Sequence, residues 1–242
     1  MQKYRTMFNQ YFKKFDMREK HMLSKFHHTY RVVEYAKEIA RSLKLNEHDI
    51  WLSEMIGLFH DIGRFEQWTK YSTFSDQKSI DHATLACKIL EEEKILEDID
   101  INDKKIILDA IENHNKYEIN NIDDDRTLLF CRIIRDADKL DILFEQDNTI
   151  DEKQNKLSSE LLNQIYNKKP CLNTYVKTDV DRVIRHMGFI VDLNFKYSFK
   201  LLKEKEWFKN KFNLLENYVE DLDEVTKLNE FINNYVEEKI LC

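Results

Sequence analysis

The stretch that decides the fold of this protein is Leu58-Phe59-His60-Asp61-Ile62-Gly63-Arg64. A histidine and an aspartate stand side by side at the end of an apolar run with helical spacing, and His60 extends its buried face. Glycine favours the left-handed conformation that ends many helices, so Gly63 predicts a helix stop. Asp61 then lies in the last turn, where the helix dipole disfavours a carboxylate and a metal ion would supply positive charge. For this pair alone, an aspartate bonded to its own helix end beside a core histidine remains the alternative.

The composition of the 242-residue chain predicts an all-α protein. Three glycines and one proline are far fewer than average usage gives, and long helices need few of either. Hydrophobic residues make up 42% of the sequence, which is enough for a core, and charged residues make up 34%, which suits solvated helix faces. We expect a single globular helical core over residues 1–150, with a C-terminal helical extension over residues 151–242 packed on it.

The net charge of −7 argues against a partner that is a nucleic-acid polymer, because proteins that bind one usually carry a basic footprint. The four cysteines lack the Cys-x-x-Cys spacing of zinc fingers and redox pairs. The N-terminus has no signal-peptide pattern, and no apolar run approaches the roughly 20 residues that span a bilayer. We therefore expect a cytoplasmic protein without a membrane partner, and the sequence leaves its oligomeric state open.

Several polar residues continue the apolar stripes of separate predicted helices. They are His28, His60, His82, His114 and Asp138. A single inward histidine is more often a satisfied core residue than a ligand, but each member of such a group would be costly to bury without a partner. A shared metal centre would satisfy them together, and a mixture of imidazole and carboxylate suits Mn, Fe, Co, Ni or Zn better than Mg.

Helical spacing also separates these candidates from neighbours of the same residue type. His28 falls on the apolar face of its helix, whereas His27 aligns with polar residues. Asp138 likewise falls on the inward face of its helix, which is predicted to begin near Asp123, whereas Asp136 is expected at the surface. Asp141 shares the inward side less cleanly than Asp138 does. We therefore predict that Asp138 is the carboxylate ligand of this helix.

The order of these motifs resembles the HD superfamily of metal-dependent phosphohydrolases. The matching segments are His28-Thr29-Tyr30-Arg31-Val32, His60-Asp61-Ile62-Gly63-Arg64, Asp81-His82-Ala83, His114 and Ala137-Asp138-Lys139-Leu140. The resemblance implies an all-α fold and a first metal site formed by His28, His60, Asp61 and Asp138. In members with two metals, histidines placed like His82 and His114 join the second ion, and an aspartate placed like Asp61 bridges the two.

The resemblance implies hydrolysis of a small phosphate ester, with a nucleotide as the expected substrate, by water that one or two divalent metal ions activate. Arg64 and Lys139 flank ligand motifs, so we expect them to bind phosphate and to act with Asp61 in catalysis; surface charge is the alternative for both. Two other classes remain open. One is a sensor or scaffold that binds metal or nucleotide without turnover, and the other is a helical interaction protein whose histidines are core residues.

The second half of the chain contributes two further candidates. His186 lies four residues before Ile190 and therefore faces inward, and Arg182 precedes His186 by four residues, so we expect both on one buried face. We predict that Arg182 and His186 bind the substrate phosphate opposite the metals without ligating them. An internal ion pair of the arginine, beside a core histidine, is the alternative.

Overall fold

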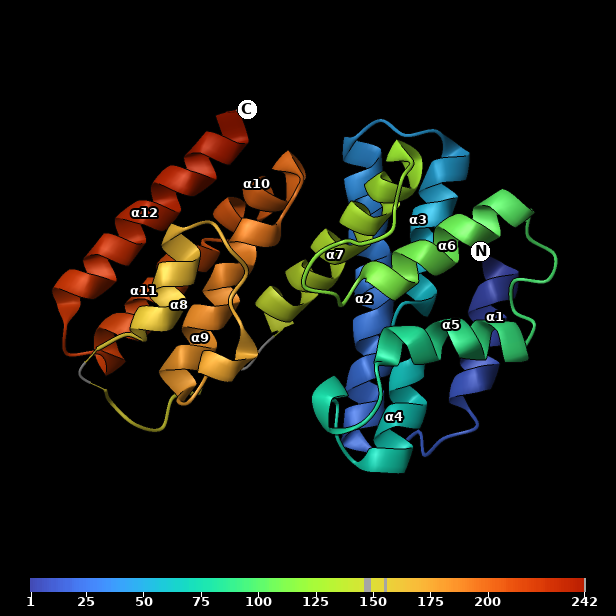
Figure 1. Ribbon diagram of the computed structural model, residues 1–242, viewed down its shortest axis with the longest axis horizontal. Coiled ribbons are helices and arrows are strands. Elements are labelled where there is room, and N and C mark those ends of the chain that lie inside the picture. The colour runs from blue at the N-terminus through green and yellow to red at the C-terminus, as the bar shows by residue number, and fades with distance from the viewer. Residues whose placement is uncertain (146–148, 155, 242) are drawn as a thin grey trace. The chain divides into compact units, whose positions relative to one another are not determined.

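The computed structural model of the protein describes residues 1–145, 149–154 and 156–241, and it confirms the predicted all-α class (Figure 1). The described residues form helices joined by loops, and the β structure among them is one isolated parallel bridge between Gln154 and Val219. Within the described ranges, no helix combines the length and the apolar character that crossing a bilayer requires.

The chain divides into two compact units, Met1–Asp141 and Ile142–Cys242. Helices of the first unit are α1 (Gln2–Phe12), α2 (Lys20–Ser42), α3 (Glu47–Phe59), α4 (Gly63–Tyr71), the 3-10 turn η1 (Asp76–Lys78), α5 (His82–Glu92), α6 (Ile101–Asn113) and most of α7 (Asp125–Glu145). Those of the second are α8 (Ser159–Tyr166), η2 (Asn173–Tyr175), α9 (Asp179–Met187), η3 (Gly188–Asp192), α10 (Lys196–Glu204), α11 (Trp207–Tyr218) and α12 (Leu222–Leu241). The predicted domain division at residue 150 stays a prediction.

The turn between α3 and α4 ends the first helix earlier than the sequence predicts and by a different geometry, because Asp61, expected in the last turn of that helix, lies beyond its end. α3 ends at Phe59, His60 keeps right-handed helical angles, and α4 begins at Gly63. No described glycine has a positive φ, so the predicted left-handed stop is wrong. Gly63 is needed for close packing instead, because a Cβ there would overlap the carbonyl oxygen of His82. The bare backbone lets α4 approach α5 and brings the His60–Asp61 pair beside His82.

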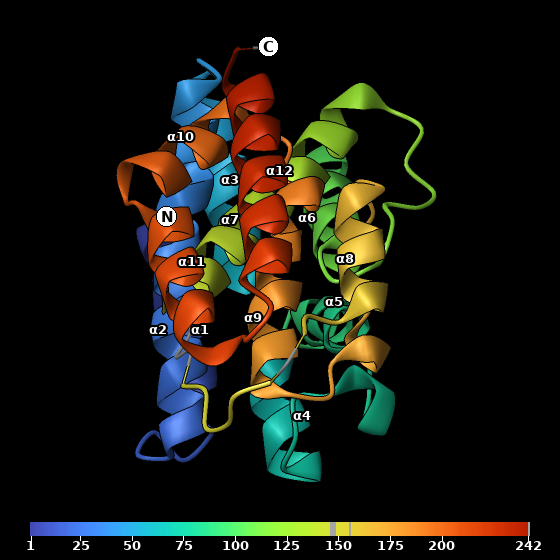
Figure 2. The ribbon, with the colours of Figure 1, turned by 90° about the vertical axis from the view of Figure 1, so that its left-hand side faces the viewer.

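The core of the N-terminal unit lies between α2 and α3, which run side by side in Figure 1. His28 of α2 is buried, as are Val32 and Ala36 further along the same face, while His27 is exposed. Burial of that face confirms the predicted orientation of the two histidines. In the C-terminal unit, α10, α11 and α12 pack on one another, and α9 packs on α8 and α11 (Figures 1 and 2).

Candidate metal centre

Four histidines present their Nε2 atoms to one buried centre of the N-terminal unit. Each Nδ1 lies against an oxygen. Nδ1 of His28 is 2.7 Å from Asp141, and that of His82 is 2.7 Å from Asp76. Nδ1 of His60 is 2.8 Å from the Gly57 carbonyl oxygen, and that of His114 is 2.7 Å from the Ile111 carbonyl oxygen. Carbonyl and carboxylate oxygens only accept, so each Nδ1 donates its proton to the oxygen beside it. The other nitrogen of each ring, Nε2, is then oriented as in metal-binding histidines.

Asp61 lies at the centre, and its two oxygens face different pairs of histidines. Oδ2 is 3.4 Å from Nε2 of His28 and 3.7 Å from that of His60. Oδ1 is 3.3 Å from Nε2 of His82 and 3.7 Å from that of His114. The two Nε2 atoms are 3.3 Å apart in the first pair and 3.0 Å apart in the second. Two groups of donor atoms therefore share one carboxylate.

Asp138 adds a second carboxylate to the first group. Its Oδ1 lies 3.2 Å from Nε2 of His28 and 3.7 Å from that of His60. Ligand atoms of these three residues lie within 4.8 Å of one another, as do those of His60, Asp61 and His114. The histidines and Asp61 are buried, so each group is a compact donor set shielded from solvent.

The charges around His28 show why a cation fits the first group. Burial and the positive charge of Lys25 lower the pKa of His28, but hydrogen bonds to Asp138, Asp141 and Asp61 outweigh them and raise it to about 10. Three carboxylates thus keep a proton on this ring. A divalent metal would replace that proton and neutralise the carboxylates, since ligand histidines must be neutral. The donor set is mixed nitrogen and oxygen, which fits a first-row transition metal.

The second group of donor atoms, around His82 and His114, gives an independent reason to expect a bound cation. Burial lowers the pKa of His82 to about 4, so the ring is neutral at pH 7. Its Nδ1 carries the proton donated to Asp76, so its Nε2 presents a lone pair to Nε2 of His114, 3.0 Å away. One cation could bind both Nε2 atoms. The residues of both groups therefore fit a divalent metal.

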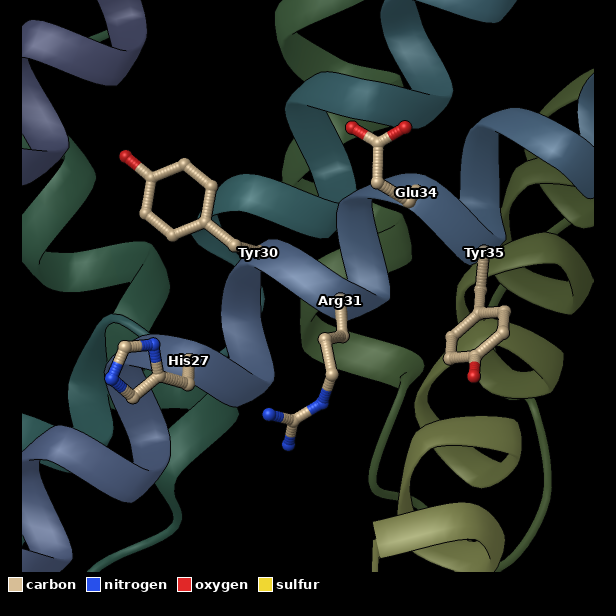
Figure 3. A pocket seen from close by; sticks show the side chains of 5 residues that line it. All are labelled: His27, Tyr30, Arg31, Glu34 and Tyr35. Atoms are coloured by element: carbon tan, nitrogen blue, oxygen red, sulfur yellow. The ribbon is translucent and has the colours of Figure 1, made fainter.

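Two carboxylates that the sequence did not single out as ligands hold these rings in place. Asp141 accepts from His28 and also from Arg31, with 2.6 Å between Nε and Oδ1 and 3.0 Å between Nη2 and Oδ2. Asp141 therefore orients the His28 ring, and the assignment of Asp138 as the ligand of this helix stays a prediction. Arg31 reaches it from the outer side of α2, where it lines a surface pocket with His27 (Figure 3). That pocket contains none of the donor residues.

Asp76 likewise accepts a hydrogen bond from Nδ1 of His82 and so orients that ring. The sequence does not single it out because it lies in an irregular segment. It sits in η1, within the stretch after α4 that has no helical period. Arg64 Nη1 lies 3.2 Å and Gln67 Nε2 2.8 Å from Asp76 Oδ1, so both donate to the carboxylate that orients the ring. Asp81 also lies near His82 and Asp76, with ligand atoms of the three within 4.8 Å of one another, but its carboxylate already accepts from backbone amides of α5 and from Lys116.

Two cations flank Asp61. Lys25 Nζ lies 2.8 Å from Oδ2, and Arg64 Nε lies 3.4 Å from Oδ1. Burial raises the pKa of Asp61, but the charges of Lys25, His60 and Arg64 outweigh it and hold that pKa well below its usual range. Lys25 was missed by the sequence reasoning, although its position three residues before His28 places it on the same helix face.

On α7, the burial of Asp136 differs from the prediction, and the burial of Lys139 decides between its two readings. Asp136 was expected at the surface but is fully buried, with Arg135 beside it 3% exposed. This part of α7 is covered on more than one side, so helix faces do not separate ligand from surface positions here. Lys139 is buried too, at 9% exposure, so it is not the surface charge that was its alternative.

In the C-terminal unit, the prediction that Arg182 and His186 share one buried face is wrong for Arg182. His186 is 4% exposed, as predicted, but the side chain of Arg182 is 38% exposed. Arg182 Nη1 lies 2.7 Å from Asp179, and Nη2 donates to the Thr149 carbonyl. A long side chain near a helix N-terminus can extend to water and to an acid of the first turn, so a four-residue spacing alone does not bury it.

Comparison with known families gives one result that agrees with this geometry. The family model described as the HD domain matches residues 26–143, which contain every donor residue of both groups. Neither the curated proteins nor the solved structures contain a match to the chain. The matched segment, the all-α fold and the converging histidine and aspartate donors agree with one another, and residues 26–143 of the chain form an HD domain.

Proposed function

We propose that the protein is a metal-dependent phosphohydrolase that cleaves a small phosphate ester at a two-metal centre. The observation that carries the proposal is the position of Asp61, whose two oxygens face two separate histidine pairs. His28, His60 and Asp138 would hold the first ion, His82 and His114 the second, and Asp61 both. Divalent ions bound there would supply charge neutralisation for phosphoryl oxygens and an activated water at neutral pH.

Residues of the chain itself would position the phosphate. Lys25 and Arg64 place positive charge on either side of Asp61, and phosphoryl transfer depends mainly on positioning and on charge neutralisation. Burial of the centre lowers the local dielectric and strengthens these interactions. Nη1 of Arg64 already donates to Asp76, so this arginine would orient the second histidine pair as well as face the substrate. Lys139 remains a candidate for binding the phosphate.

A nucleotide is the substrate class that the surroundings favour. Phe74 lies with its ring 5.6 Å from Lys25 Nζ and 5.6 Å from Arg64 Cζ, so it stands beside both cations that flank Asp61. Trp68 lies next to it, with the ring centroids 4.8 Å apart, and both rings are partly exposed. Aromatic rings of this kind bind a base by stacking. A nucleoside phosphate would then have its phosphate at the metals and its base against Phe74.

The test is phosphate release from p-nitrophenyl phosphate and from a panel of nucleoside mono-, di- and triphosphates, with Mn²⁺ added. We expect turnover that EDTA abolishes and that is higher for at least one nucleotide than for the generic ester. A protein that binds Mn²⁺ and turns over nothing in the panel would be the non-catalytic sensor or scaffold. A protein that binds no metal would contradict both readings.

A further inference from the structure

The C-terminal unit contains a second group of buried nitrogen atoms, at the end of α9. Nε of Arg185 and Nδ1 of His186 are both buried, and neither has a hydrogen-bond partner among the described residues. His186 is 4% exposed, so bulk solvent does not reach its ring. Buried side-chain nitrogens are almost always hydrogen-bonded in native proteins, and exceptions often mark a place where a ligand binds.

Positive charge accumulates at this point without a neutralising acid. The guanidinium of Arg185 lies 5.0 Å from the ring of Phe189, and the ammonium of Lys211 lies 5.3 Å from the ring of Trp207. In the described part of the chain, neither cation forms an ion pair. Cys171 is the acidic group that acts on Arg185, but burial raises its pKa to about 12, so it stays a neutral thiol.

The unneutralised positive charge also lowers the pKa of His186. Burial and the charges of Arg185, Arg182 and Lys211 lower its pKa to about 3, and no carboxylate opposes them. α9 and α11 pack on each other, and the charge of Lys211 on α11 acts on His186. Arg185 and Lys211 are half-buried, and contacts with aromatic rings recover only part of the desolvation cost of such cations. The missing component is a negative charge.

We propose that Arg185, His186 and Lys211 form an anion-binding site within the C-terminal unit and that its ligand is a phosphate group. Arginine offers a planar fork of N–H donors that matches phosphate oxygens, and lysine adds a compact positive charge. His186 Nδ1 would donate the third hydrogen bond. Arg182 takes no part, because its guanidinium is already paired with Asp179.

The experiment measures the binding of inorganic phosphate to the full chain after removal of metal with EDTA, by calorimetry and by the phosphate-dependent shift of the unfolding midpoint. Arg185→Met removes the charge and keeps the length. It should weaken phosphate binding about tenfold or more, because bonds to a charged group are lost. Arg182→Met is the matched control, with the same charge change on the same helix, and should change binding by about twofold at most, as expected of an exposed ion pair.

Lys211→Met is the second test variant if Arg185→Met does not fold, and it should also weaken phosphate binding. Wild-type protein that binds no phosphate would overturn the proposal, as would equal effects of Arg185→Met and Arg182→Met. So would an Arg185→Met protein that is less stable without phosphate and keeps the wild-type response to it, since the arginine would then serve packing alone.

Binding is measured without metal, so its outcome is independent of whether the metal centre is catalytic. A separate assay assigns the source of the phosphate. With metal present, a raised KM of Arg185→Met at unchanged kcat would mean that the site binds the substrate of the metal centre. An unchanged KM, together with lost phosphate binding, would mean that the ligand is a separate phosphorylated compound.

Discussion

Replacing Asp61 with asparagine is expected to lower phosphate-ester turnover about a thousandfold or more, because the charge stabilisation lost with a metal is several kcal/mol and each ~1.4 kcal/mol is tenfold in rate. The neutral amide cannot hold two cations, while its shape is nearly that of the carboxylate. Metal content, measured by elemental analysis, should fall in both groups of ligands, since Oδ1 faces one and Oδ2 the other.

The control for this variant is Asp123→Asn, which removes an exposed carboxylate of the same unit. It should keep both turnover and metal. Circular dichroism should show that Asp61→Asn remains helical, because Lys25 can move its ammonium to water from a side chain that is 20% exposed. An Asp61→Asn protein with wild-type turnover would show that the carboxylate is structural.

The second large effect is expected from His28→Ala, compared with His27→Ala on the same helix. His28 Nε2 lies within 3.4 Å of both Asp61 and Asp138, so its removal should weaken metal binding by at least the roughly 10- to 100-fold that loss of a supporting residue costs. Turnover should fall in parallel. His27 is exposed and lines a surface pocket beside α2 (Figure 3), so its replacement should leave metal content and turnover near those of wild type. Equal metal losses in the two variants would contradict the assignment.

The sequence predicts the buried donor residues because a regular helix repeats its buried face. His28 and His82 precede apolar residues of their helices by three or four positions, and His114 follows such residues at the same spacing. The structure buries all three. The same argument fails for Asp136, which is fully buried although Arg132, one turn before it on the predicted polar side, is exposed. It also fails for Arg182, since a long side chain reaches water from a position near the core.

The residues that orient the histidines could not be predicted from periodicity. Asp76 belongs to an irregular segment, and only the fold brings it to His82. Asp141 lies one turn after Asp138 on the same helix, and the direction of the His28 ring decides which of them faces Nε2 and which Nδ1. The packing role of Gly63 likewise depends on α5, which follows later in the chain.

The central claim is that Asp61 joins two metal sites in one centre. Anomalous diffraction at the manganese edge, from crystals grown with excess Mn²⁺, tests it directly. The account predicts two manganese peaks, one beside His28, His60 and Asp138 and the other beside His82 and His114, with one oxygen of Asp61 on each. A single peak, with His82 and His114 still facing each other without an ion, would contradict it.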